Sequence, residues 1–192
     1  MANEIYNRLT LRGNAAEIQE CINFIKGDDT VIDCEKIIPI PIQLKNTSVS
    51  TNTNECILYY LLKDGISEVI SNVTEWRTDP PSSWWNKSQE EFDKMYQQGK
   101  QYYQNYLDLG YTTWYKWAWD NWGTCSTYTY DQEIRMESDD CAHILFFTGW
   151  TGIKPVIDKI QSLYPNINME YITLDLEDPN NLIESDEEPP MT

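Results

Sequence analysis

The chain contains one histidine and five cysteines, the side chains that most often act as proton carriers, nucleophiles or metal ligands. His143 lies in the segment Cys141-Ala-His-Ile-Leu-Phe-Phe147, which is typical of a buried strand. Alternation along a strand does not place a nucleophile and an orienting acid around one histidine, so a structural role is favoured over catalysis. The cysteines are Cys21, Cys34, Cys56, Cys125 and Cys141. They are widely spread without a Cys-x-x-Cys pair, which argues against a zinc site or a disulfide scaffold and favours a reducing compartment.

Carboxylates are far more abundant than histidine and cysteine. The chain has 31 acidic and 14 basic residues, which gives a net charge of −17. A pair of them flanking an aromatic cleft would suit glycoside hydrolysis, but no such pair stands out. Asp28-Asp29 and Asp139-Asp140 do not match a calcium-binding loop. Two interpretations of the charge stay open. The acids could simply keep the protein soluble, or they could mimic nucleic acid and occupy a partner's basic groove. The charge exceeds what solubility requires of one small domain.

The same charge excludes several classes of target. Binding to a nucleic-acid backbone or to anionic lipid needs clustered Lys and Arg, so we expect neither direct nucleic-acid binding nor membrane association. The longest apolar run, Ile57 to Leu62, has six residues, far short of a membrane span. No export signal is visible near Asn3, Glu4 and Arg8, and we expect a cytoplasmic location.

Tryptophans gather between residues 114 and 122, and two roles are open for them. They could form a stacking platform for bases, a sugar or a partner's side chains. The favoured role is structural, with Trp114, Trp117 and Trp122 anchoring the segment and Asn121-Trp-Gly-Thr124 forming a tight turn. Trp119 should point away from the anchoring face and is an exposed candidate. Two more candidates, Trp84 and Trp85, follow a Pro-Pro turn.

Hydrophobic periodicity predicts the elements that would position these residues. Strands are expected at 5–11, 128–136, 142–148 and 167–176, with a turn at Asp139-Asp140. Helices are expected at 14–26, at 55–72 with a break or kink near Gly65, at 88–109, at 112–121 and around 156–163. Capping boxes mark two of the helix starts, at Asn14 with Glu17 and at Ser88 with Glu91. Residues 37–41 should form an extended connection and 43–54 a mobile loop.

Without its middle, the chain runs strand, helix, strand, strand, helix, strand. This order predicts an α+β, ferredoxin-like fold, in which a split βαβ pattern builds a four-stranded antiparallel sheet with two helices on one face. Residues 1–176 are expected to form a single domain that carries a large helical, aromatic-rich insert at about 43–124. Residues 177–192 are acidic and should form a flexible tail.

Several stretches also carry a family resemblance. They are Asn7-Arg-Leu-Thr-Leu-Arg-Gly13, Lys36-Ile-Ile-Pro-Ile-Pro41, Trp114-Tyr-Lys-Trp117, Asn121-Trp-Gly-Thr124 and Phe147-Thr-Gly-Trp150. Together they resemble the YubB-type ferredoxin-like family of bacteriophages, prophages and conjugative plasmids. The chain departs from the family pattern at Cys125 and Ser126, where the family commonly has lysine and tryptophan. The resemblance implies a fold and a mobile-element origin, and it implies no activity.

The sequence therefore predicts a non-enzymatic accessory protein, without catalytic residues, metal or cofactor. It would bind and inhibit a host or defence protein with a basic surface, through acidic and aromatic side chains. The predicted partner-binding residues are Asp139, Asp140, Trp84, Trp85, Trp119, Glu184, Asp186, Glu187 and Glu188. The predicted structural residues are Trp114, Trp117, Asn121, Trp122, Gly123 and Trp150. The alternative is a small-ligand module that binds a nucleotide or a sugar through the Trp/Tyr-rich insert.

Overall fold

The structure is a computed structural model that describes residues 3–47, 52–66, 82–127 and 130–177. The chain divides into two compact units, Met1–Pro39 with Ala118–Thr192 and Ile40–Trp117. We call the first the sheet unit and the second the helical unit. Across the described ranges, no helix is both long enough and apolar enough to cross a membrane.

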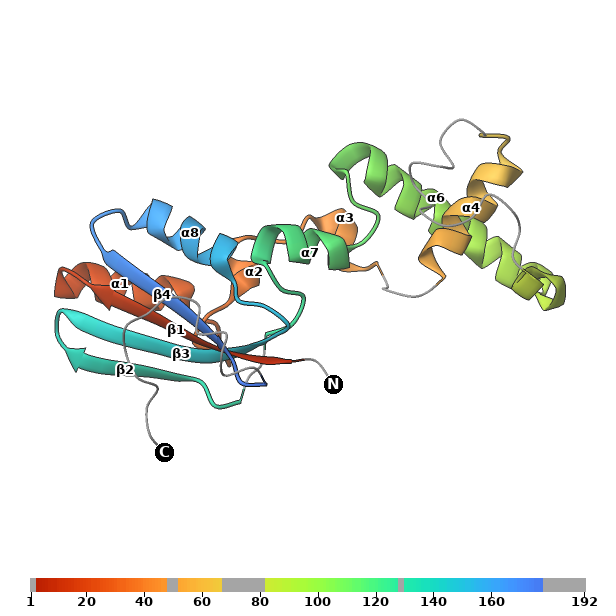
Figure 1. The fold of residues 1–192 in the computed structure, drawn as a ribbon. Helices are drawn as coiled ribbons and strands as arrows, with labels where there is room; N and C mark the ends of the chain where they lie inside the picture. Colours follow the sequence, from red (N-terminus) through yellow and green to blue (C-terminus); the bar gives the residue numbers. More distant parts are fainter. Residues whose placement is uncertain (1–2, 48–51, 67–81, 128–129, 178–192) are drawn as a thin grey trace. The chain divides into compact units, whose positions relative to one another are not determined.

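The sheet unit is built on four strands, which Figure 1 shows in the order β2, β3, β1, β4. They are β1 (Glu4–Arg12), β2 (Glu133–Ser138), β3 (Cys141–Gly149) and β4 (Asn168–Asp175). All three pairings are antiparallel, and Leu9 of β1 lies between Ile144 of β3 and Tyr171 of β4. The predicted four-stranded antiparallel sheet and α+β class are confirmed, and the strand order is compatible with a ferredoxin-like fold.

Two amphipathic helices, α1 (Ala15–Ile25) and α8 (Lys154–Leu163), bury their apolar sides against the sheet. The Asn14 side chain begins α1 by accepting hydrogen bonds from the backbone N–H groups of Ala16 and Glu17. Because side chains alternate between the two faces of a strand, every second residue of these strands faces this core. The core residues from the sheet and the two helices include Leu9, Leu11, Ile144, Phe146, Ile18, Ile22, Ile25, Val156, Ile157 and Ile160.

Two predictions for the sheet unit need correction. The strand expected at 128–136 begins only at Glu133, because Asp131 adopts a positive φ of 47° that no strand continues through. Residues 128–129 lie outside the described ranges. A short helix, α2 (Cys34–Ile37), was not expected and takes the first residue of the expected extended connection, Ile37, while Ile38 is extended. Asp33 caps this helix by accepting from the Lys36 N–H at 3.1 Å.

The helical unit contains α3 (Ile42–Lys45), α4 (Thr53–Lys63), the 3₁₀ helix η1 (Ser82–Asn86) and α6 (Gln89–Leu109). A further helix, α7 (Trp114–Trp122), begins in this unit and ends in the sheet unit. The prediction for α6 is confirmed, with a complete Ser88–Glu91 capping box and Gly110 in the left-handed conformation at its end.

Other predictions for this unit are wrong in their boundaries. Residues 42–45, placed largely in a mobile loop, form α3, and the hydroxyl of Thr47 donates to the carbonyl of Leu44 at 2.6 Å just after it. The helix expected at 55–72 with a break or kink near Gly65 ends at Lys63, and the break is confirmed, because Gly65 adopts a φ of 70°. Residues 67–81 lie outside the described ranges.

Helices α4 and α6 cross at very short range (Figure 1). Gly99 permits the crossing, because a Cβ atom at this position would lie 1.9 Å from the backbone oxygen of Cys56. Around the crossing, aromatic rings pack on an aliphatic centre. The contributing residues are Ile57, Leu58, Leu61, Met95 and Tyr102, with Tyr59, Tyr60, Trp84, Phe92, Tyr103 and Tyr106 beside them.

Candidate functional site

A buried polar network runs through the centre of the sheet unit. Asn7 is 0% exposed, and its Nδ2 donates to the hydroxyl of Thr148 at 2.9 Å and to the carbonyl of Ile5 at 2.8 Å. The phenol of Tyr171 donates to Asn7 Oδ1 at 2.5 Å and accepts from the backbone N–H of Ile153 at 2.7 Å. Burial raises the pKa of Tyr171, so the phenol stays neutral. The network therefore holds the phenol in one orientation.

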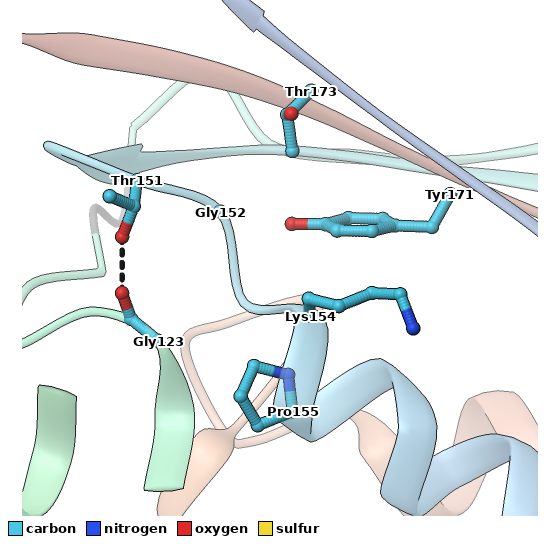
Figure 2. Close-up of a pocket in the computed structure, with 7 residues that line it drawn as sticks. All are labelled: Gly123, Thr151, Gly152, Lys154, Pro155, Tyr171 and Thr173. Carbon is cyan, nitrogen blue, oxygen red and sulfur yellow. Dashed lines mark hydrogen bonds between the residues drawn. The ribbon is translucent and has the colours of Figure 1, made fainter. Parts of the chain in front are cut away.

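A pocket of about 520 Å³ opens beside this phenol (Figure 2). Its lining consists of Gly123, Thr151, Gly152, Lys154, Pro155, Tyr171 and Thr173. Figure 2 shows the ring of Tyr171 between the side chains of Thr173 and Lys154. The volume falls within the range of small-molecule sites, and the lining offers one cation and several hydroxyls. Such a pocket suits a small polar ligand.

Two glycines leave the space for this pocket. A Cβ at Gly152 would lie 2.5 Å from the phenolic oxygen of Tyr171, and a Cβ at Gly123 would lie 2.6 Å from the carbonyl oxygen of Gly152. Gly123 also has a φ of 87°, which favours glycine. The hydroxyl of Thr151 donates to the carbonyl of Gly123 and joins the two loops. Sequence reasoning missed this pocket, because the glycines approach each other from positions almost 30 residues apart.

The predicted structural residues of the sheet unit lie around the same loops. Trp122 is half-buried against the sheet core, and its indole N–H donates to the carbonyl of Ile38 at 2.9 Å. Trp150 has a φ of 72°, and its side chain is 50% exposed. Asn121 is half-buried. In the helical unit, Trp117 is 7% exposed and Trp114 is half-buried.

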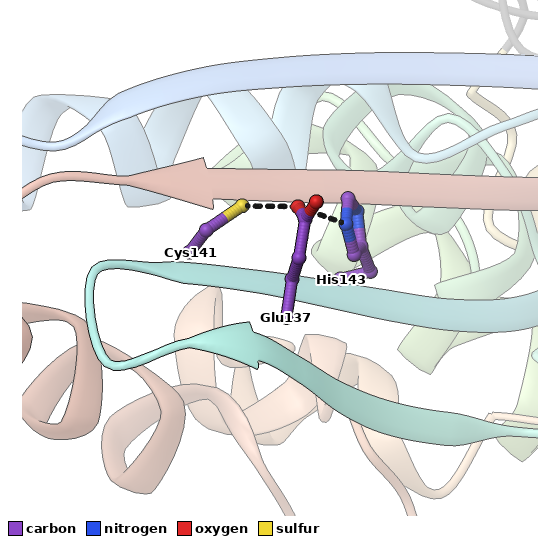
Figure 3. Close-up of side chains that lie close together, drawn as sticks. All are labelled: Glu137, Cys141 and His143. Atoms are coloured by element: carbon purple, nitrogen blue, oxygen red, sulfur yellow. Dashed lines mark hydrogen bonds and ion pairs between the residues drawn. The ribbon is translucent and has the colours of Figure 1, made fainter.

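A second cluster lies on the other face of the β2–β3 hairpin (Figure 3). Glu137 Oε2 lies 3.1 Å from Cys141 Sγ and 3.1 Å from His143 Nε2. Both contacts hold the pKa of Glu137 below its usual range. Desolvation, together with the nearby Glu137, raises the pKa of the Cys141 thiol. His143 is half-buried rather than buried, and the argument that strand alternation keeps chemically useful groups apart from it is wrong.

A signal for this cluster was present in the sequence. Cys141 and His143 are two residues apart on a predicted strand, so they share one face of the sheet. The predicted turn at Asp139-Asp140 returns Glu137 to the same end of the hairpin. What the sequence did not indicate is a β-bulge between Met136 and Ser138, which makes Glu137 the extra residue of β2.

The other cysteines offer little reactivity. Burial raises the pKa of the Cys21 and Cys34 thiols to about 12 and that of Cys56 to about 11. They therefore stay protonated at neutral pH and behave as small apolar side chains. Cys125 is half-buried.

The predicted partner-binding residues fall in both units. Asp139 and Asp140 are exposed at the hairpin turn of the sheet unit. Trp85 of the helical unit is 86% exposed, whereas Trp84 is half-buried, with its ring 5.3 Å from that of Tyr59. Trp119, expected to be exposed, is half-buried in the sheet unit. The remaining candidates, Glu184, Asp186, Glu187 and Glu188, lie outside the described residues.

Charge is distributed unequally between the two units. The sheet unit holds 22 acidic and 7 basic residues, a net charge of −15, and the helical unit holds 9 and 7, a net charge of −2. Aromatic residues show the opposite bias, with 14 of the 25 in the 78 residues of the helical unit. The electrostatic field of the protein therefore originates in the sheet unit.

In comparisons with known proteins, no family model, curated protein or solved structure matches the chain.

Proposed function

We propose that the protein is a non-enzymatic accessory protein of phage or mobile-element origin, which binds and inhibits a basic host or defence protein in the bacterial cytoplasm. The observation that carries this proposal is the net charge of −15 on the sheet unit. A field of this size accelerates encounter with a basic surface and disfavours partners of like charge.

Carboxylates at the hairpin turn are the best candidates for contact. Asp139 and Asp140 are exposed, and the turn is held by two hydrogen bonds. The hydroxyl of Ser138 donates to Asp140 Oδ1 at 2.5 Å, and the backbone N–H of Gly13 donates to the carbonyl of Asp140 at 3.1 Å. Carboxylates held in place bind with a smaller loss of conformational entropy than those of a flexible segment. This supports recognition in which the turn takes the place of nucleic-acid phosphates.

The proposal includes a split βαβ, ferredoxin-like architecture for the sheet unit, with the helical unit as an insert between α2 and β2. Support comes from the sheet order β2-β3-β1-β4 with antiparallel neighbours, and from α1 and α8 packing on one core. The pairings make β1 parallel to β2, and β3 parallel to β4, as two βαβ crossovers require. The resemblance to the YubB-type family belongs to the same proposal.

The test is capture of partners from bacterial lysate with the full chain as bait, followed by competition with double-stranded DNA. We expect a basic protein that is retained at about 0.05 M salt and released at about 0.5 M, where the Debye length is well below 10 Å. DNA should displace that protein if the acidic surface occupies a nucleic-acid groove. Retention at high salt, or retention against excess DNA, would contradict charge mimicry.

A second function, binding of a nucleotide or a sugar, is favoured by the pocket at Tyr171. The sequence predicts such a ligand on the Trp/Tyr-rich insert at about 43–124, but only Gly123 of the lining residues falls in that range, and all of them belong to the sheet unit. Lys154 and the hydroxyls of Thr151 and Thr173 are suited to phosphate or sugar oxygens. A thermal shift with nucleotides or sugars that is lost in Lys154→Ala and Thr173→Val would support this function, and an unchanged melting temperature with every ligand would exclude it.

A further inference from the structure

The hairpin cluster combines three different ligand types from a short stretch of chain. Glu137 Oε2, Cys141 Sγ and His143 Nε2 all lie within 4.8 Å of one another. Zinc ligands at bond lengths of about 2.0–2.3 Å in a tetrahedral arrangement are about 3.3–3.6 Å apart. The two contacts of Glu137 are both 3.1 Å, so small side-chain rotations would bring the three atoms to these separations.

The backbone explains why these side chains converge. Cys141 pairs with Ser138 and His143 pairs with Arg135, so the bulge residue Glu137 lies between the two pairs. A bulge re-aims a side chain and is over-represented beside functional sites. Figure 3 shows the carboxylate of Glu137 directed between the thiol of Cys141 and the ring of His143.

A neighbouring hydroxyl completes the surroundings of the histidine. Thr10 lies directly opposite His143 on β1, is 1% exposed, and places its Oγ1 3.1 Å from His143 Nδ1. When the Nδ1–H of His143 donates a hydrogen bond to Thr10 Oγ1, the lone pair of Nε2 is free for a metal ion. Metal-bound histidines are oriented by this kind of outer hydrogen bond.

We propose that Glu137, Cys141 and His143 bind one Zn²⁺ ion, with water in the fourth position. A soft thiolate together with imidazole favours zinc over magnesium or calcium. On binding, the thiol of Cys141 gives its proton to the solvent, and the thiolate and the Glu137 carboxylate balance the two charges of the ion. Arg12, which lies beside Cys141, already forms an ion pair with Glu170 at 3.4 Å.

The experiment titrates the reduced, chelator-treated full chain with ZnCl₂ in competition with a chromophoric chelator. Cobalt is used in parallel, because a Co²⁺ ion bound to cysteine absorbs through thiolate-to-metal charge transfer. We expect one Zn²⁺ per chain and a thiolate–cobalt band. Cys141→Ser and His143→Gln should each weaken binding more than about 100-fold, and Thr10→Val, which removes only the outer hydrogen bond, about 10- to 100-fold.

Matched controls separate this site from non-specific binding. Cys125→Ser removes a half-buried thiol elsewhere, and Asp139→Asn with Asp140→Asn removes two carboxylates from the adjoining turn. Both should bind zinc within about twofold of the parent, since single ligands of a metal site are worth far more than that. Glu137 is exposed, so Glu137→Gln keeps the fold and must itself weaken binding more than about 10-fold. Parent-like affinity in Glu137→Gln or Cys141→Ser, or no stoichiometric zinc on the parent, would overturn the proposal.

Discussion

The cores of the sheet unit and the helical unit are built from different kinds of side chain. In the sheet unit, aliphatic residues such as Leu9, Ile144 and Ile160 fill the space between the sheet and its helices. In the helical unit, two helices cross at Gly99, and rings such as Tyr59 and Phe92, whose centroids are 4.9 Å apart, surround the crossing. The sheet unit carries nearly all the net charge, and the helical unit carries most of the aromatic rings.

The two units also differ in their buried polar groups. The sheet unit buries Asn7 in a network that reaches the pocket, whereas the helical unit buries Asn105, which donates to the carbonyls of Gln43 and Thr112 at 3.3 Å each. The second arrangement ties α3 and the segment before α7 to α6. The described polar network beside a pocket therefore belongs to the sheet unit.

The largest expected effect is the loss of a buried ring from the helical unit. Trp117→Ala should lower the free energy of unfolding by about 3–5 kcal/mol, because truncating a buried aromatic side chain loses apolar burial and leaves a cavity. Urea denaturation followed by circular dichroism measures it. Trp85→Ala, at an 86% exposed position, serves as the control and should change stability by less than about 0.5 kcal/mol. Equal stability of the two variants would show that Trp117 is not a core residue.

A slightly smaller loss is expected at the helix crossing. Gly99→Ala should cost about 3 kcal/mol, because its Cβ would meet the backbone of Cys56 at 1.9 Å and α4 must move away from α6. Hydrogen exchange should show the lost protection in these two helices, with amides of β1 and β3 as an internal reference. Gln97→Ala, on the exposed side of α6, is the matched control. Unchanged protection of α4 in Gly99→Ala would contradict the close crossing.

In the sheet unit, the buried polar network around Asn7 is expected to contribute to stability. Asn7→Ala should lower the free energy of unfolding by about 2 kcal/mol, because it leaves the hydroxyls of Thr148 and Tyr171 without their buried partner. Asn23→Ala, at an exposed position of α1, should have little effect. Thermal unfolding of both variants measures the difference. A fully stable Asn7→Ala protein would mean that the network does not support the pocket.

The smallest stability effect concerns the start of α6. Ser88→Ala should cost about 1 kcal/mol, since the Ser88 hydroxyl accepts from the Glu91 N–H. Hydrogen bonds from the backbone N–H and hydroxyl of Ser88 hold the pKa of Glu91 below its usual value. A depressed folded-state pKa adds stability above the unfolded-state pKa, near 4.5, and that stability is lost as the pH falls through the folded-state pKa. Glu91→Gln should therefore reduce the loss of unfolding free energy as the pH falls below about 4.5. An unchanged pH dependence would show that the capping box does not contribute to it.

Local signals explain which parts of the fold could be predicted from sequence. The bounds of α6 follow from a capping box and a terminal glycine, and the strands follow from alternation, because both depend on neighbouring residues. The break after α4 follows from Gly65, but the short α3 was missed, since it depends on a turn conformation that many sequences accommodate. The spacing of Cys141 and His143 places them on one face of a strand, but the convergence of Glu137 on them depends on a bulge that the sequence does not indicate. The pocket depends on two glycines distant in sequence, which no local pattern reveals.

The most direct test of the proposed recognition compares charge reversal in the two units. Asp139→Lys/Asp140→Lys changes the sheet unit, and Glu90→Lys/Asp108→Lys makes the same net change on exposed positions of α6. The association rate of each variant with the captured basic partner is measured at about 0.05 M and about 0.5 M salt. We predict on the order of a tenfold slower association for the sheet-unit variant at low salt, about twofold for the control, and convergence of the rates at high salt. Equal rates for the parent and the sheet-unit variant at low salt would contradict recognition through the charge of the sheet unit.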